Sequence, residues 1–176
     1  MMLRYLFVFQ PQSGRETTFR FAISRATANP LRMTDTVFVL NGPNLNLLGT
    51  REPDIYGSDT LADIEAMLAD KARELGLAIE FRQTNHEGVL VDWLHEARSV
   101  GAKAVLLNAA AYTHTSIALL DAIKAIELPV IEVHLSDPAT REGFRHLSYV
   151  GIAAVDEVKG LGPRGYAVAL EKAAAL

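Results

Sequence analysis

Cysteine is absent from this chain of 176 residues. A disulfide framework, thiolate metal ligands and cysteine redox chemistry are therefore excluded, and a reducing compartment is expected. The chain also has no apolar run long enough to cross a bilayer, and its net charge of -4 argues against general binding to nucleic acid. We therefore expect a cytoplasmic protein with a small-molecule partner, and with neither a membrane nor a nucleic-acid partner.

Acidic residues are scarce at the start of the chain. Residues 1–32 carry five arginines and one glutamate, and their apolar stretch is too short for a signal peptide. A transit peptide is one interpretation, but we favour a disordered extension or a mis-assigned start, with Met33 as the natural first residue. Because 49% of the chain is hydrophobic, residues 34–176 can form the core of a single catalytic domain.

From residue 36 onward, short apolar runs rich in β-branched residues alternate with segments of helical periodicity. This alternation predicts βαβ units and a parallel sheet. The predicted strands are Val37–Leu40, Ala78–Gln83, Ala104–Asn108, Val130–Leu135 and, more weakly, Ile152–Val155. The intervening segments each carry one apolar stripe that can pack on a sheet, and a closing helix is predicted from Tyr166 to Leu176. We therefore predict an α/β fold, a flavodoxin-like open five-stranded parallel sheet with helices on both faces.

Amides, histidines and hydroxyls collect after the predicted strands, whereas the opposite loops are ordinary turns. The polar segments are 41–46, 85–88, 108–116 and 132–136. In open parallel sheets, ligands bind outside the carboxyl ends of the strands. The sequence therefore predicts a binding or catalytic site at this edge.

Glu132 and His134 are two residues apart on a predicted strand, so their side chains should point to the same face. One interpretation is a buried pair without a function. The other is a carboxylate that orients an imidazole for general acid or base catalysis. We favour catalysis, because burying charge without a purpose is costly.

A charged loop, Arg51–Gly57, follows the first predicted strand and contains Tyr56. A solvated surface loop is the simpler interpretation, and a lid over the site is the alternative. A tyrosine base needs a lowered pKa, and lowering it by about 2 from its usual value near 10 requires on the order of 2.7 kcal/mol. One or two partly desolvated arginines can supply this free energy, and Arg51 is close in sequence.

Three further patterns are less specific. Arg141 and Arg145 share a face if residues 138–146 are helical, and then either grip an anion or face solvent. Residues 160–165 match G-x-G-x-x-G, but too little chain follows for a dinucleotide-binding unit, so we interpret them as a turn before the last helix. The five histidines show no metal-binding spacing. We therefore expect no metal and no cofactor.

Five segments in this order resemble the type II 3-dehydroquinate dehydratases. They read VFVLNGPNLNLLGTREPDIYG, NHEGVLVDWLHEA, LLNAAAYTHTSIALLDAI, PVIEVHLSD and REGFRHLSYV. The resemblance extends from about Thr36 to the C-terminus. It implies a carbon–oxygen lyase of the shikimate pathway of aromatic amino acid biosynthesis, which converts 3-dehydroquinate into 3-dehydroshikimate by anti elimination of water through an enolate, without metal or cofactor.

The resemblance also implies a role for each catalytic residue. Tyr56 would be the base that removes the proton next to the ketone, and Arg51 would make its phenolate accessible. Asn44 would stabilise the enolate oxygen through a water molecule. His134 would protonate the departing hydroxyl, and Glu132 would orient His134.

Substrate binding and assembly are implied in the same way. The residues expected to hold the substrate are Asn108, His114 and Arg145 at its hydroxyls, Ser136 and the Leu135 amide at its carboxylate, and Asp121 from a neighbouring subunit. Trimers assembled into a homododecamer are implied, although an exposed helix carboxylate explains Asp121 equally well.

Two other functions remain open from the sequence. A flavodoxin-like ligand-binding or receiver module without catalysis would need neither Tyr56 nor His134. A metal-dependent hydrolase could be built on His114, His134 and Glu132. The type I dehydratase mechanism needs a catalytic lysine, and only Lys159 lies near a strand end, so it is disfavoured.

Overall fold

A computed structural model describes residues 34–50 and 59–176. Its strands are β1 (Thr36–Asn41), β2 (Ala78–Gln83), β3 (Ala104–Asn108), β4 (Val130–Val133) and β5 (Asp156–Val158). All neighbouring strands are parallel, and the order across the sheet is β2-β1-β3-β4-β5. This is the flavodoxin-like order, so the predicted fold class is confirmed. The predictions for residues 1–33 lie outside the described residues.

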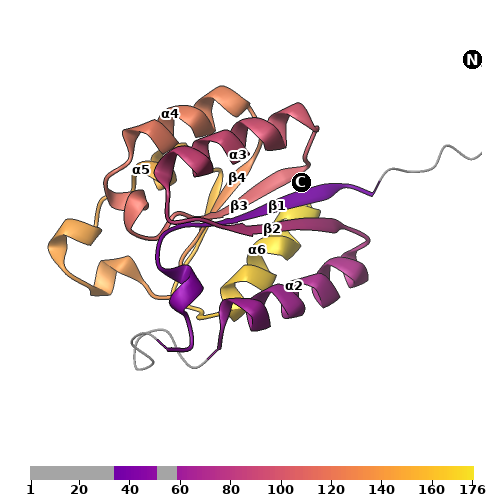
Figure 1. Ribbon diagram of the computed structural model, residues 1–176, viewed down its shortest axis with the longest axis horizontal. Helices are drawn as coiled ribbons and strands as arrows, with labels where there is room; N and C mark the ends of the chain where they lie inside the picture. Colours follow the sequence, from indigo (N-terminus) through magenta and orange to yellow (C-terminus); the bar gives the residue numbers. More distant parts are fainter. Residues whose placement is uncertain (1–33, 51–58) are drawn as a thin grey trace, which may run out of the picture. The chain divides into compact units, whose positions relative to one another are not determined.

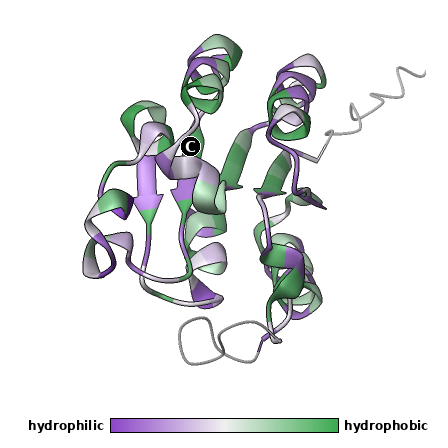
Figure 2. Cartoon of the chain, turned by 60° about the vertical axis from the view of Figure 1, so that its left-hand side comes forward, coloured by the Kyte–Doolittle hydropathy of each residue, from purple (hydrophilic) through white to green (hydrophobic). Residues whose placement is uncertain are grey.

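Helices cover both faces of this sheet (Figure 1). One face is covered by α2 (Leu61–Leu75) and α6 (Arg164–Ala174), and the other by α3 (Glu87–Ser99), α4 (Ile117–Ile126) and α5 (Tyr149–Ala153). The four longer helices, α2, α3, α4 and α6, carry both hydrophobic and hydrophilic residues (Figure 2), as expected for helices that pack one side against a sheet. The strand residues alternate between two buried clusters, one on each face.

Local sequence signals fix the ends of several helices. Thr60 and Asp63 form a reciprocal capping box at the start of α2, and Gly76 ends this helix in the left-handed conformation at φ 69°. Ser116 caps α4 by accepting a hydrogen bond from the backbone N–H of Leu119 at 2.9 Å. These caps satisfy backbone groups that helix ends leave without partners.

The prediction of a fifth strand at Ile152–Val155 was wrong in position. Residues Tyr149–Ala153 form the short helix α5, and the strand lies at Asp156–Val158. Ser148 caps α5 through the backbone N–H of Gly151, and only Val158 is buried in the strand. Charged residues are common on such edge strands because they oppose pairing with other chains, and here they mask the strand pattern.

Two further predictions need correction beyond β4. The strand ends at Val133 rather than at Leu135, although the backbone N–H of His134 still donates to the Val158 carbonyl at 2.8 Å. Residues 138–146 do not form one helix but two 3-10 turns, η3 (Pro138–Thr140) and η4 (Gly143–Arg145). The helical spacing assumed for the two arginines of this segment is therefore wrong.

The carboxyl ends of β1 and β3 approach each other closely. The backbone N–H of Gly42 donates to the Asn108 carbonyl at 2.8 Å, and a Cβ atom on Gly42 would lie 2.5 Å from the Ala109 carbonyl oxygen. Only glycine allows this approach. In the described part of the chain, no helix is both long and apolar enough to span a membrane.

Candidate active site

A cavity opens at the carboxyl edge of the sheet, where the polar residues were predicted to gather. About 720 Å³ of space, part of it open to solvent, lies between its lining atoms. Seven of the predicted site residues line it: Asn44, Asn108, His114, His134, Leu135, Ser136 and Arg145. The strand ends thus bring together residues that are up to a hundred positions apart in sequence.

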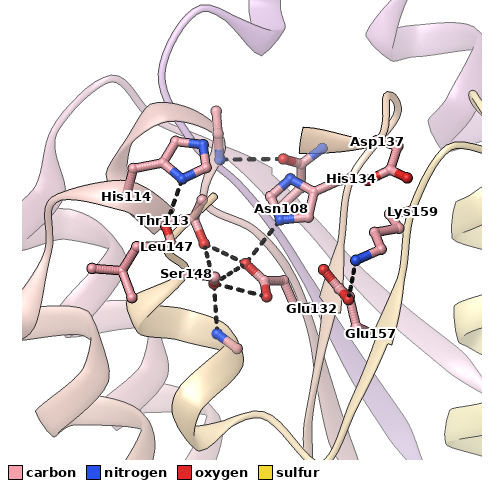
Figure 3. A network of polar contacts seen from close by, with 12 residues as sticks. Asn108, Thr113, His114, Glu132, His134, Asp137, Leu147, Ser148, Glu157 and Lys159 are labelled. Carbon is pink, nitrogen blue, oxygen red and sulfur yellow. Dashed lines mark hydrogen bonds and ion pairs between the residues drawn. The ribbon is translucent and has the colours of Figure 1, made fainter. Parts of the chain in front are cut away.

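His134 and Glu132 form a hydrogen-bonded pair beside this cavity (Figure 3). Nε2 of His134 lies 2.9 Å from Oε1 of Glu132, and Glu132 is fully buried whereas His134 is 7% exposed. An ionised carboxylate accepts but cannot donate, so it holds the proton of the imidazole on Nε2. Nδ1, which has no hydrogen-bond partner among the described residues, is then left for a substrate in the cavity.

The environment of Glu132 keeps its carboxyl group ionised. Burial alone would raise the pKa of Glu132, but hydrogen bonds from His134, Thr113 and Ser148 more than offset this effect. The net pKa of Glu132 therefore lies below its ordinary value. The ionised carboxylate therefore accepts the hydrogen bond that fixes the orientation of the His134 ring.

Two cationic side chains and a second histidine line the same cavity. The Nε atom of Arg145 lies 2.9 Å from Oε2 of Glu142, and that of Arg141 lies 3.5 Å from the same oxygen. His114 contacts the Leu147 carbonyl through Nδ1 at 2.8 Å, so Nδ1 carries the proton and Nε2 is free to accept when the ring is neutral. The site thus offers cations for an anionic group and an acceptor for a hydroxyl.

A buried polar cluster fixes Asn108 beneath the cavity. Its Nδ2 atom donates to the hydroxyl of Tyr166 at 2.8 Å, and the Tyr166 hydroxyl donates to Oδ1 of Asn41 at 2.6 Å. Burial raises the pKa of Tyr166, so this phenol stays neutral and keeps the proton that it donates to Asn41. One hydrogen of the Asn108 amide has no partner in this cluster and remains for a ligand.

Asn44, which also lines the cavity, has an unusual backbone conformation. It adopts the left-handed conformation at φ 66°, and its backbone N–H donates to Oδ1 of Asn85 at 2.9 Å. Non-glycine residues in this conformation are uncommon and concentrate at functional sites. Nε2 of Gln83 donates to the same Asn85 oxygen at 3.1 Å. This second hydrogen bond fixes the side-chain amide of Asn85, which accepts from Asn44.

Three predicted site residues remain untested. Asp121 is exposed on α4 and does not line the cavity, so the expectation that it reaches a neighbouring subunit stays a prediction. Arg51 and Tyr56 lie outside the described residues. Their predicted roles as cation and base therefore also stay predictions.

One group of potential metal ligands occurs in the described residues. Single ligand atoms of Glu132, His134 and Glu157 lie within 4.8 Å of one another. Glu132 already accepts hydrogen bonds from three side chains, and Glu157 is paired with Lys159 at 2.9 Å. Because a cation would have to displace these partners, and because His114 does not belong to the group, the metal-hydrolase alternative gains no support.

The sequence did not predict the residues that contact and orient the site residues. These are Thr113 and Ser148 at the Glu132 carboxylate, Gly151 beside it, Glu142 between the arginines and Tyr166 under Asn108. Thr113 is next to His114 in a segment already recognised as polar, so its position gave a signal. Ser148 and Tyr166 gave none, because only the folded chain brings them to the strand ends.

Comparisons with known proteins agree with this geometry. A model of the family described as dehydroquinase class II matches residues 35–174. A 3-dehydroquinate dehydratase from Maricaulis maris (strain MCS10) is 58% identical over 141 residues, covering 80% of this chain and 96% of that protein. One from Rhizobium johnstonii (strain DSM 114642 / LMG 32736 / 3841) is 59% identical over 140 residues, covering 78% and 94%.

A solved structure of a type II dehydroquinase from Propionibacterium acnes matches with a TM-score of 0.78 at 44% identity, covering 82% of this chain and 99% of that one. The strand order defines a flavodoxin-like α/β protein, and the His134–Glu132 pair lies at the carboxyl edge where such folds bind ligands. More specifically, the chain belongs to the class II dehydroquinase family, and it is a hydro-lyase. The alternative of a binding module without catalysis is therefore wrong.

Proposed function

We propose that this enzyme removes water from 3-dehydroquinate by anti elimination through an enolate and releases 3-dehydroshikimate, as a step of aromatic amino acid biosynthesis. The observation that carries the proposal is the His134–Glu132 pair, in which the 2.9 Å hydrogen bond fixes Nε2 and leaves Nδ1 for the substrate. The family membership and the relatives named 3-dehydroquinate dehydratase support the substrate.

The elimination needs two proton transfers on opposite faces of the substrate ring. The phenolate of Tyr56 takes the proton next to the ketone, with Arg51 stabilising the phenolate, and an enolate forms. Asn44 stabilises the enolate oxygen through a water molecule. His134 then gives its proton to the departing hydroxyl, which leaves as water, while Glu132 compensates the charge of the imidazolium.

The remaining residues bind and orient the substrate. Asn108, His114 and Arg145 contact its hydroxyls, and Ser136 with the Leu135 amide holds its carboxylate. Support for these contacts comes from the cavity, which all five residues line. Orientation of this kind lowers the barrier by restricting the reacting groups before the chemistry begins.

The proposed enzyme is an oligomer. We place the catalytic domain at residues 34–176, in trimers that build a homododecamer in the cytoplasm, with Asp121 of one subunit reaching the cavity of the next. The exposed position of Asp121 on α4 supports a contact with a neighbour. Size-exclusion chromatography with light scattering should give the mass of twelve chains, and a monomer with full activity would contradict this assembly.

The test of the function is direct. Purified protein is incubated with 3-dehydroquinate, and the conjugated enone of the product is followed by its ultraviolet absorbance. We expect turnover that a chelator leaves unchanged, because no step requires a metal. No enone at high enzyme concentration would overturn the proposed function, and loss of activity in chelator would favour a metal-dependent reaction.

A further inference from the structure

Two hydroxyl groups hold the carboxylate of Glu132 in addition to His134 (Figure 3). Thr113, from the 3-10 helix η2 (Ala110–His114), donates to Oε1. Ser148, the N-cap of α5, lies 2.7 Å from Oε1 and 2.9 Å from Oε2. Thr113 is fully buried, so its hydroxyl has no access to bulk water as a substitute partner.

Counting protons fixes the direction of these hydrogen bonds. Each hydroxyl has one proton. The Oγ atom of Ser148 already accepts from the backbone N–H of Gly151 at 2.7 Å. Its own proton goes to Glu132 at 2.7 Å, which is nearer than Oγ1 of Thr113 at 3.0 Å. The proton of Thr113 also points to Glu132. The carboxylate therefore accepts hydrogen bonds from three side chains and donates none. This pattern requires the ionised form of Glu132.

We propose that Thr113 and Ser148 are positioning residues for proton transfer by His134, because their hydroxyls set the orientation and the effective negative charge of Glu132. The inference rests on the proposed function. Each hydroxyl that donates to a carboxylate takes up part of its charge, so the carboxylate holds the imidazole proton less tightly. Removing one hydroxyl frees the carboxylate to turn and concentrates its negative charge, which stabilises the imidazolium more strongly and slows release of the Nδ1 proton to the leaving group.

The other charged and titratable groups around the pair do not replace these hydroxyls. These groups are Glu157 in β5, Lys159 directly after β5, Asp137 between β4 and η3, His114 in η2, and Arg141 and Arg145 after η3. Glu157 is occupied by Lys159 at 2.9 Å, and the ring of His114 lies 6.4 Å from that of His134, centroid to centroid. Within the described residues, His134, Thr113 and Ser148 supply every side-chain hydrogen bond to Glu132.

The experiment compares Thr113→Val, which keeps the shape and removes the hydroxyl, with Thr113→Ser, which keeps the hydroxyl. We expect kcat of Thr113→Val to fall about tenfold with KM nearly unchanged, and kcat of Thr113→Ser to stay near the wild-type value. The alkaline limb of the kcat profile should move to higher pH in Thr113→Val, because the transferred proton is held more tightly.

Ser148→Ala should lower kcat in the same way, and Ser116→Ala is its matched control. Both serines cap a helix, α5 and α4 respectively, but Ser116 does not contact Glu132. Ser116→Ala should therefore lower the melting temperature without moving the alkaline limb. An equal effect of the two alanine variants on kcat would show that capping is the cause, and would overturn the inference.

A measurement without substrate separates this inference from the proposed function. In the proton NMR spectrum, the ring N–H signal of His134 that is hydrogen-bonded to Glu132, assigned by its loss in His134→Gln, should move downfield in Thr113→Val and stay in place in Thr113→Ser. Enone formation by the wild-type protein tests the function itself. An unmoved signal with wild-type kcat in Thr113→Val, or an equal kcat loss in Thr113→Ser, would overturn the positioning role while leaving the function intact.

Discussion

The phenol oxygen of Tyr166 lies 2.8 Å from Nδ2 of Asn108, 58 residues away in sequence. Both side chains are buried, so this bond connects α6 to the floor of the cavity. Tyr166→Phe would leave the amide of Asn108 and the Oδ1 atom of Asn41 without this partner. We expect the free energy of unfolding to fall by about 1–3 kcal/mol, and KM to rise as Asn108 loses its orientation. Urea unfolding followed by circular dichroism measures the first effect.

Tyr149→Phe is the control for this prediction, because the Tyr149 hydroxyl makes no hydrogen bond within the described residues. It should change neither stability nor KM. Equal stability of Tyr166→Phe and the wild-type protein would contradict the role of the buried cluster.

Replacing Glu132 should remove the orientation of His134. Glu132→Gln is similar in shape but carries no negative charge to stabilise the imidazolium, so we expect kcat to fall by about 10²-fold with KM within about twofold. Glu157→Gln is the matched control, since Glu157 faces the same pair from β5 but does not bond to His134. Steady-state kinetics of both variants check this, and equal losses would point to a general charge effect instead.

Acid should weaken the fold partly through Glu132. Its pKa is lower in the folded than in the unfolded state, so its contribution to stability is fully present above the ordinary carboxyl pKa of about 4.3 and is lost as the pH falls through the lower folded value. The wild-type protein should therefore melt at a higher temperature than Glu132→Gln at neutral pH, and the difference should shrink below about pH 4. Calorimetry over this range tests it; a difference independent of pH would contradict the lowered pKa.

Gly151 should tolerate no side chain. A Cβ atom there would lie 2.7 Å from Oε2 of Glu132 and 3.1 Å from Oγ of Ser148, so Gly151→Ala must displace the carboxylate. We expect kcat to fall by about tenfold or more, with stability reduced by about 1–3 kcal/mol. Gly88→Ala in α3 is the control, because nothing lies within 4 Å of its Cβ position. Activity of Gly151→Ala at the wild-type level would show that the carboxylate position does not limit the reaction.

Regular patterns made the fold predictable from the sequence. The strands β1 and β3 are nearly continuous apolar runs, and the helices around them carry single apolar stripes, so both follow from periodicity. The short edge strand β5 was predicted at the wrong residues because two of its three residues are charged and exposed. The helix predicted over 138–146 does not form, because the segment divides into two 3-10 turns. Asp137 begins the first of them, and its side chain accepts from the backbone N–H of Ala139.

The edge of the sheet that carries the site was predictable from its polar loops, but a direct contact between side chains was predictable only for neighbours along one strand. Glu132 and His134 are two residues apart, so the alternation of side chains along a strand places them on one face. Thr113, Ser148 and Tyr166 reach the same edge from three other elements, and no spacing in the sequence encodes their hydrogen bonds. Such contacts depend on how helices pack on the sheet rather than on local pattern.

Turnover by Tyr56→Phe tests the central claim most directly, since the account assigns the whole proton abstraction to one hydroxyl. The phenyl ring keeps the shape of the side chain, so substrate affinity, measured by isothermal titration, should stay within about threefold of wild type, while kcat for enone formation falls by about 10³-fold or more. Full enone formation by Tyr56→Phe would contradict the account.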